Sequence, residues 1–146
     1  MSVSNGFKSP LIVKHVARGW HRLELPLLYR YEDWLIYAPA GFVTDFASVP
    51  RIPGVYWAWG ARAAPSAVVH DMLYRFGLRS RKFADKVFLD AMKHEGKSIW
   101  IRYPMYSAVR AFGRQAYNSA PGCLDYRDVP CEHYYPQWEN CVRRLN

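Results

Sequence analysis

Residues 65–92 read PSAVVHDMLYRFGLRSRKFADKVFLDAM, and their helix-start and helix-end signals predict a pair of helices. Pro65 suits the first turn of a helix and Gly77 its end, so a first helix is predicted between them. Ser80 can cap a second helix, in which small and apolar residues recur at helical spacing until Gly96 closes it. Because the connection between the two helices is short, they are expected to run antiparallel.

The flanking segments predict strands before this helix pair and one more helix after it. Residues 27–31 and 34–37 have the composition of strands and are separated by Glu32-Asp33, which favours a hairpin turn, and 23–25 is a further short strand. A third helix is expected from Pro104 to about Tyr117. The predicted fold class is therefore α+β, with N-terminal short antiparallel strands followed by a three-helix core that contains the antiparallel pair.

The chain has 146 residues, which suits one domain with one core. We expect a globular domain over 1–122 and an irregular C-terminal tail over 123–146 that packs on it. All three cysteines, Cys123, Cys131 and Cys141, lie in that tail, and their odd number does not give a closed disulfide framework. The sequence contains neither a secretory signal nor an apolar run long enough to cross a bilayer.

The charge balance favours polyanionic partners. The chain has 20 Lys and Arg residues against 12 Asp and Glu, a formal net charge of +8. Such a surface attracts anionic phospholipid or nucleic acid, and it can also be an ordinary solvated surface. The aromatic segment 56–59 (YWAW) is either an interfacial anchor for lipid or part of the core.

The helix pair carries a constellation suited to hydrolysis. His70 and Tyr74 are one helical turn apart and share a face, whereas Asp71 points about 100° away. The antiparallel return of the second helix can bring Asp85 beside His70. A carboxylate bonded to one imidazole nitrogen fixes the tautomer and leaves the other nitrogen as a general base.

A cation is expected next to this pair. Asp71 needs a compensating charge if it is buried, and the loop Thr44-Asp45-Phe46 offers a second carboxylate and backbone oxygens. Calcium prefers such oxygen ligands, and it would polarise an ester carbonyl. Asp45 and Asp71 are therefore the predicted Ca²⁺ ligands.

These residues give the chain a resemblance to the phospholipase A₂ superfamily, especially its short secreted bacterial and fungal members. The matching positions on the two helices are His70, Asp71, Tyr74, Asp85, Phe88 and Met92. The resemblance implies that His70 is the base, Asp85 the orienting carboxylate, Asp71 a calcium ligand and Asp45 the loop ligand. The chain differs from that superfamily in having no Cys before Cys123.

A second resemblance covers roughly residues 35 to 115. The segment 41–51 (GFVTDFASVPR), then HDxLY from His70, then Arg81 with ADxxF, look like a domain family of unknown function found in tailed phages and prophages. It implies a viral origin, and location in the host cytoplasm or the virion, without an established activity.

Each site residue also has a purely structural interpretation. Asp45 can cap its own turn, and His70 can be a hydrogen-bonded core histidine. Asp71 can pair with Arg75 at i+4, and Asp85 can favour the start of its helix.

Three functions follow from these alternatives. The main hypothesis is a phage-encoded, calcium-dependent hydrolase of phospholipid-like esters. The alternative is a non-enzymatic virion protein, or one that blocks a host factor, in which the same residues form a structural polar cluster. The third is a nucleic-acid-binding protein that uses its basic helices.

Overall fold

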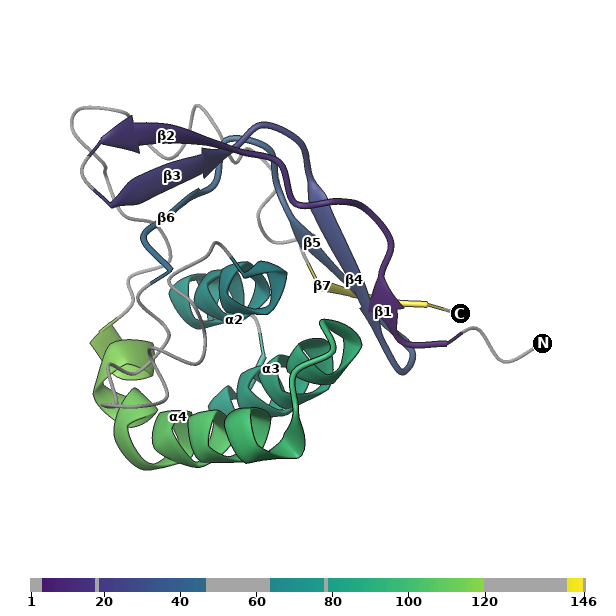
Figure 1. The fold of residues 1–146 in the computed structure, drawn as a ribbon, viewed down its shortest axis with the longest axis vertical. Helices are drawn as coiled ribbons and strands as arrows, with labels where there is room; N and C mark the ends of the chain where they lie inside the picture. The colour runs from purple at the N-terminus through teal and green to yellow at the C-terminus, as the bar shows by residue number, and fades with distance from the viewer. Residues whose placement is uncertain (1–3, 18, 47–63, 78, 120–141, 146) are drawn as a thin grey trace.

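A computed structural model of the chain describes residues 4–17, 19–46, 64–77, 79–119 and 142–145. Within these residues, two small antiparallel sheets lie on one side of three helices (Figure 1). The sheets have the strand orders β1-β4-β5-β7 and β2-β3-β6. The elements are β1 (Gly6–Phe7), β2 (Val13–Ala17), β3 (Trp20–Leu23), β4 (Leu27–Tyr31), β5 (Trp34–Ala38), β6 (Val43–Thr44), α2 (Pro65–Phe76), α3 (Arg81–His94), α4 (Ile99–Ser119) and β7 (Val142–Arg144). The predicted α+β class, with strands before three helices, is confirmed.

Strands β4 and β5 form the hairpin that the sequence predicts. Their turn is at Glu32-Asp33, where Glu32 adopts a positive φ of 51°. Tyr29 and Ile36 are partners across the ladder and are both completely buried, which places this face of the hairpin in the core.

The second sheet differs from the sequence prediction. Strand β3 ends at Leu23, so the strand expected at 23–25 begins and ends earlier. Residues 24–26 then connect β3 to β4, which belongs to the other sheet. Strands β2 and β6 were not predicted. They form by antiparallel pairing with β3, and no local hydrophobic pattern indicates them.

The helix pair follows its predicted boundaries. Helix α2 begins at Pro65 and is closed by Gly77, whose φ of 58° lies in the left-handed region that glycine favours. Helix α3 is capped by Ser80, whose hydroxyl accepts a hydrogen bond from the backbone N–H of Phe83 at 3.2 Å.

Helix α4 begins five residues before the predicted start, at Ile99, and contains Pro104. The backbone N–H groups of Ile101 and Arg102 both bond to the carbonyl of Ser98, so the first turn forms ahead of the proline. Pro104 is exposed, and its ring therefore meets solvent and not a packed neighbour.

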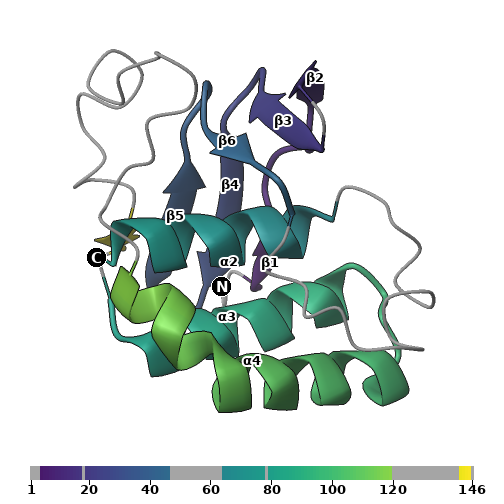
Figure 2. The ribbon, with the colours of Figure 1, turned by 90° about the vertical axis from the view of Figure 1, so that its left-hand side faces the viewer.

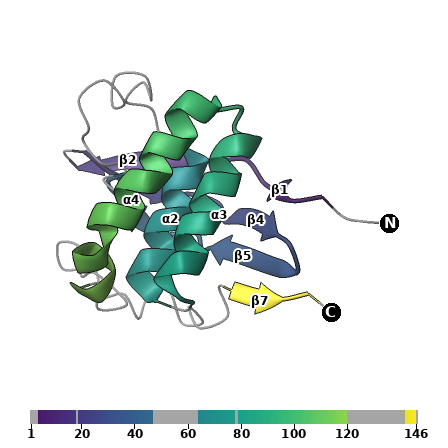
Figure 3. The ribbon, with the colours of Figure 1, turned by 90° about the horizontal axis from the view of Figure 1, so that it is seen from below.

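Helices and sheets form two layers with the core between them. Figure 2 shows α2 running across the strands, with α4 on the side of the helical layer away from them, and Figure 3 shows α4 in front of α2 and α3. One apolar cluster joins the hairpin to α2, and a second lies among the three helices. Met72 belongs to the first cluster, and Phe88 and Met105 belong to the second. The α2–α3 pair is thus enclosed on both sides.

The C-terminal region also contains regular structure. Residues Val142–Arg144, within a tail predicted to be irregular, form β7 and pair antiparallel with β5. The order comes from this long-range pairing, which a local pattern of three residues does not reveal. Residues 120–141, with all three cysteines, and the aromatic segment 56–59 lie outside the described residues. Within the described residues, no helix is long and apolar enough to cross a membrane.

Candidate functional site

The α2–α3 pair places Asp85 directly beside His70. The Nε2 atom of His70 lies 2.9 Å from Oδ1 of Asp85. The two residues are 1% and 0% exposed, so this contact is shielded from water. An ionised carboxylate can only accept hydrogen bonds, and Nε2 therefore carries the proton that joins the pair.

Tyr74 joins the same carboxylate oxygen. Its hydroxyl donates to Oδ1 of Asp85 at 2.6 Å, and its ring centroid lies 4.1 Å from that of His70. Burial raises the pKa of Tyr74, and the hydrogen bond to Asp85 raises it further. The phenol therefore stays neutral and acts as a donor that helps to fix Asp85.

Two arginines hold the other oxygen of Asp85. Arg110 on α4 donates to Oδ2 at 2.8 Å, and Nη1 of Arg81 lies 3.6 Å from it. Arg81 also donates to the backbone carbonyls of Val109 and Arg110, which ties the start of α3 to α4. Sequence reasoning missed both arginines as parts of this site. The sequence offered one general signal for them, because a buried carboxylate such as that of Asp85 requires a cationic partner.

These donors decide the charge of Asp85. Burial raises its pKa, but hydrogen bonds from His70, Tyr74 and Arg110 outweigh that effect and leave the pKa below its ordinary value. Asp85 is therefore ionised at neutral pH and can stabilise a protonated imidazole.

The close packing of α4 on this cluster depends on Gly113. A methyl group at Gly113 would lie 2.5 Å from the hydroxyl oxygen of Tyr74 and 3.2 Å from Cε2 of its ring. The absent side chain lets α4 approach the Tyr74–Asp85 hydrogen bond closely.

The second ring nitrogen of His70 has no partner in the part of the chain that the structure describes. Nδ1 is buried and makes no hydrogen bond to any described residue. The ring is held between Tyr74 and Phe88, whose centroid lies 4.6 Å away. An imidazole with a proton on Nε2 has a lone pair on Nδ1, which is the chemical requirement for a base.

Asp71 points away from the His70–Asp85 pair, as its helical position predicts. Its Oδ2 accepts hydrogen bonds from the hydroxyl of Thr44 at 2.8 Å and from Arg75 at 3.1 Å. The pairing at i+4 with Arg75 is confirmed. Burial raises the pKa of Asp71, while Arg75 and Thr44 lower it and the nearby charge of Asp45 raises it again.

Asp71 already has a cationic partner among the described residues. Arg75 is 8% exposed, and besides Asp71 it bonds to the carbonyl of Val43 and lies over the ring of Phe42. A fixed guanidinium thus already supplies the positive charge that the carboxylate needs, and it would repel a divalent cation. Within the described ranges, no group of three His, Cys, Asp or Glu residues is arranged to hold a metal.

The loop that carries Asp45 is nevertheless placed against α2. Thr44 accepts a hydrogen bond from the backbone N–H of Phe46 while its hydroxyl donates to Asp71. Phe46 has a positive φ of 55°, an unusual conformation for a residue with a bulky side chain. The Thr44-Asp45-Phe46 segment is therefore held in a specific conformation beside the start of the His70-Asp71 motif.

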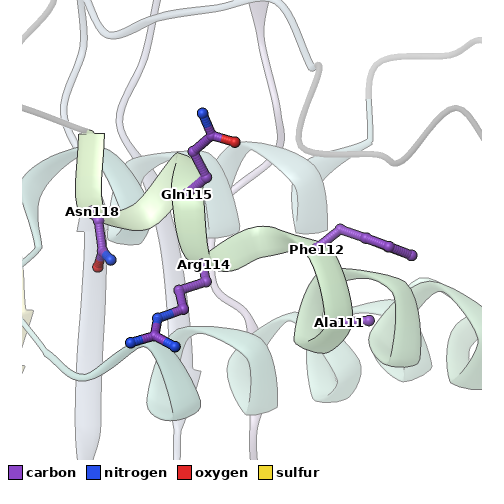
Figure 4. Close-up of a pocket in the computed structure, with 5 residues that line it drawn as sticks. All are labelled: Ala111, Phe112, Arg114, Gln115 and Asn118. Atoms are coloured by element: carbon purple, nitrogen blue, oxygen red, sulfur yellow. The ribbon is translucent and has the colours of Figure 1, made fainter.

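A pocket lies elsewhere on α4. Figure 4 shows its described lining residues, all from the second half of that helix: Ala111, Phe112, Arg114, Gln115 and Asn118. None of the five predicted site residues contributes to this lining.

Comparison with known proteins identifies a family but not an activity. A family model described as "Protein of unknown function (DUF1353)" matches residues 21–109, which is more than half of the chain. The matched region runs from β3 into α4 and includes the whole His70–Asp85 pair. Neither the curated proteins nor the solved structures contain a match. The chain therefore belongs to the DUF1353 family of proteins of unknown function.

Proposed function

We propose that this protein is a hydrolase of phospholipid-like esters in which His70 acts as the general base. The observation that carries the proposal is the state of the His70 ring, which is bonded through Nε2 to the ionised Asp85 while Nδ1 has no partner among the described residues. The choice of substrate class comes from the resemblance of this helix pair to phospholipase A₂.

The proposed reaction needs only a proton acceptor and water. Nδ1 of His70 removes a proton from a water molecule as its oxygen attacks the ester carbonyl carbon. The resulting imidazolium is stabilised by Asp85, which remains ionised. When the tetrahedral intermediate collapses, the carbon–oxygen bond to the alcohol breaks, and the proton passes from Nδ1 to the departing alkoxide oxygen.

The remaining residues of the cluster are positioning residues. Tyr74 and Arg110 hold the two oxygens of Asp85, and Asp85 in turn fixes the His70 ring. No step is assigned to calcium, because Asp71 is already paired with Arg75. We propose a phage or prophage source, on the resemblance of its ordered motifs to a family of such proteins.

The test is release of fatty acid from mixed phosphatidylglycerol and phosphatidylcholine vesicles, with and without chelator. His70→Asn should lower the rate by about 10²-fold or more, because general base catalysis contributes about that much. His94→Asn is the matched control, since His94 also lies near a carboxylate, Asp90 at 3.7 Å, but is partly exposed on α3. The chelator should leave the wild-type rate unchanged.

Equal rates of hydrolysis for wild type and His70→Asn would reject the mechanism, provided that circular dichroism shows both proteins to be folded. If the chelator abolishes hydrolysis and added calcium restores it, the calcium-dependent hypothesis is supported. The pairing of Asp71 with Arg75 would then not take the place of a calcium ion.

One observation favours a second candidate, a non-enzymatic phage protein in which the cluster is structural. His70 is 1% exposed, and both oxygens of Asp85 are already paired. A structural cluster predicts no hydrolysis by the wild type and a large loss of stability in His70→Asn.

A further inference from the structure

The turn between α3 and α4 exposes an unusual group of apolar side chains. At the start of α4, Trp100 is 83% exposed, Tyr103 52% and Ile99 50%. We call these residues, together with Lys97 and Arg102, the α3–α4 corner. Large apolar side chains so close together on a surface are commonly part of a binding surface.

The charges around this group are positive. Arg102 lies over the ring of Tyr103, with its guanidinium carbon 5.8 Å from the centroid, and donates to the carbonyl of Lys97. Helix α4 contains three arginines and no acidic residue. The acidic residue that precedes the corner, Glu95, accepts a hydrogen bond from the backbone N–H of Ser66, and burial raises its pKa while the nearby charge of Lys97 lowers it.

The position of the corner makes it accessible to a large flat partner. Figures 1 and 2 both place α4 on the side of the molecule away from the sheets. The buried side chains of α4, such as Met105 and Val109, pack against the other two helices, whereas Ile99, Trp100 and Tyr103 lie on the exposed side of the helix.

We propose that the α3–α4 corner binds the surface of an anionic phospholipid bilayer. Trp and Tyr rings favour the boundary between water and hydrocarbon, Ile99 can enter the acyl region, and Lys97 and Arg102 face the phosphates. The proposal rests on the proposed function for its choice of lipid, and it adds the surface by which the protein would reach that substrate.

The test is co-sedimentation of the full-length protein with phosphatidylglycerol vesicles and with phosphatidylcholine vesicles. Wild type should bind the anionic vesicles more tightly, and less so at high salt, because added ions screen the cationic side chains. The double variant Ile99→Ala/Trp100→Ala should weaken binding about tenfold or more, since it removes the inserted apolar surface. Leu25→Ala is the matched control, because Leu25 is also 50% exposed but lies between β3 and β4.

A second pair of variants tests the charge. Lys97→Glu should weaken binding to anionic vesicles more than Lys14→Glu, which changes the net charge equally but lies on β2. The inference is overturned if Ile99→Ala/Trp100→Ala binds as tightly as wild type, or if wild type binds no vesicles. It is also overturned if these variants weaken binding to a single-stranded oligonucleotide and leave vesicle binding unchanged.

Failure of this inference can be distinguished from failure of the proposed function. Hydrolysis of a water-soluble short-chain ester without vesicle binding would reject membrane binding by the α3–α4 corner but not the proposed hydrolase activity. Vesicle binding lost in Ile99→Ala/Trp100→Ala, without hydrolysis of any ester, would support the corner and reject the function.

Discussion

Asp85 is the residue that organises the site, because four side chains from three helices converge on its two oxygens. His70 and Tyr74 come from α2, Arg81 from α3 itself and Arg110 from α4. Only the His70 contact was predicted from the sequence. The contact with Arg110 spans 25 positions and depends on how α4 packs, which no local pattern contains.

Replacing Asp85 should change both stability and its dependence on pH. Asp85→Asn removes a buried partner of two cations and should cost about 3–5 kcal/mol at pH 7. Because the folded pKa of Asp85 lies below its ordinary value of 3.8, its ionisation stabilises the fold above that pH. This contribution is lost as the pH falls through the lowered folded pKa. Urea denaturation between pH 2 and 7 should show that loss in wild type and a smaller one in Asp85→Asn; parallel curves would contradict the assigned charge.

Gly113 should be intolerant of the smallest side chain. Alanine normally stabilises a helix relative to glycine by about 1 kcal/mol, but here its methyl group would meet the Tyr74 hydroxyl at 2.5 Å. We expect Gly113→Ala to lower the free energy of unfolding by about 1–3 kcal/mol, as overpacking does. The cost should shrink in a Tyr74→Phe background, where the hydroxyl is absent. An unchanged cost in that background would place the strain elsewhere.

At the scale of elements, the α2–α3 pair was predictable because its limits are local. Pro65, Gly77 and Ser80 mark three helix ends by their own backbone and side-chain chemistry, and the structure has them in these roles. Elements defined by distant partners were not predicted. Strand β7 exists through its pairing with β5, and α4 begins earlier than the proline that suggested its start.

Glu95 connects two of these elements and should have the opposite pH effect to Asp85. At the end of α3, it accepts a hydrogen bond from the first turn of α2, and burial raises its pKa above the ordinary 4.5 despite that bond. The folded state therefore keeps a proton that the unfolded chain releases, so this group makes stability fall as the pH rises from 4.5 through the raised pKa. Glu95→Gln should lack that decline in urea denaturation. A decline equal to that of wild type would contradict the burial of the Glu95 charge.

In the molecule as a whole, the two proposed roles belong to the same helical layer but differ in depth. The His70–Asp85 pair is buried among the helices, whereas Ile99, Trp100 and Tyr103 of the α3–α4 corner are exposed. The overall order of strands then helices was predictable from periodicity. The division of the strands into two sheets was not, since β3 pairs with β6 across more than twenty positions of chain.

The proposed chemistry depends on a His70 ring that carries its proton on Nε2 and whose Nδ1 has no partner among the described residues. A direct measurement is ¹⁵N NMR of the histidine rings at pH 8, with His70→Asn used to assign the signal. We expect a protonated Nε2 and an unprotonated Nδ1 for His70, and loss of that fixed tautomer in Asp85→Asn. A proton found on Nδ1 in the wild type would contradict the account, because that nitrogen could not then act as the base.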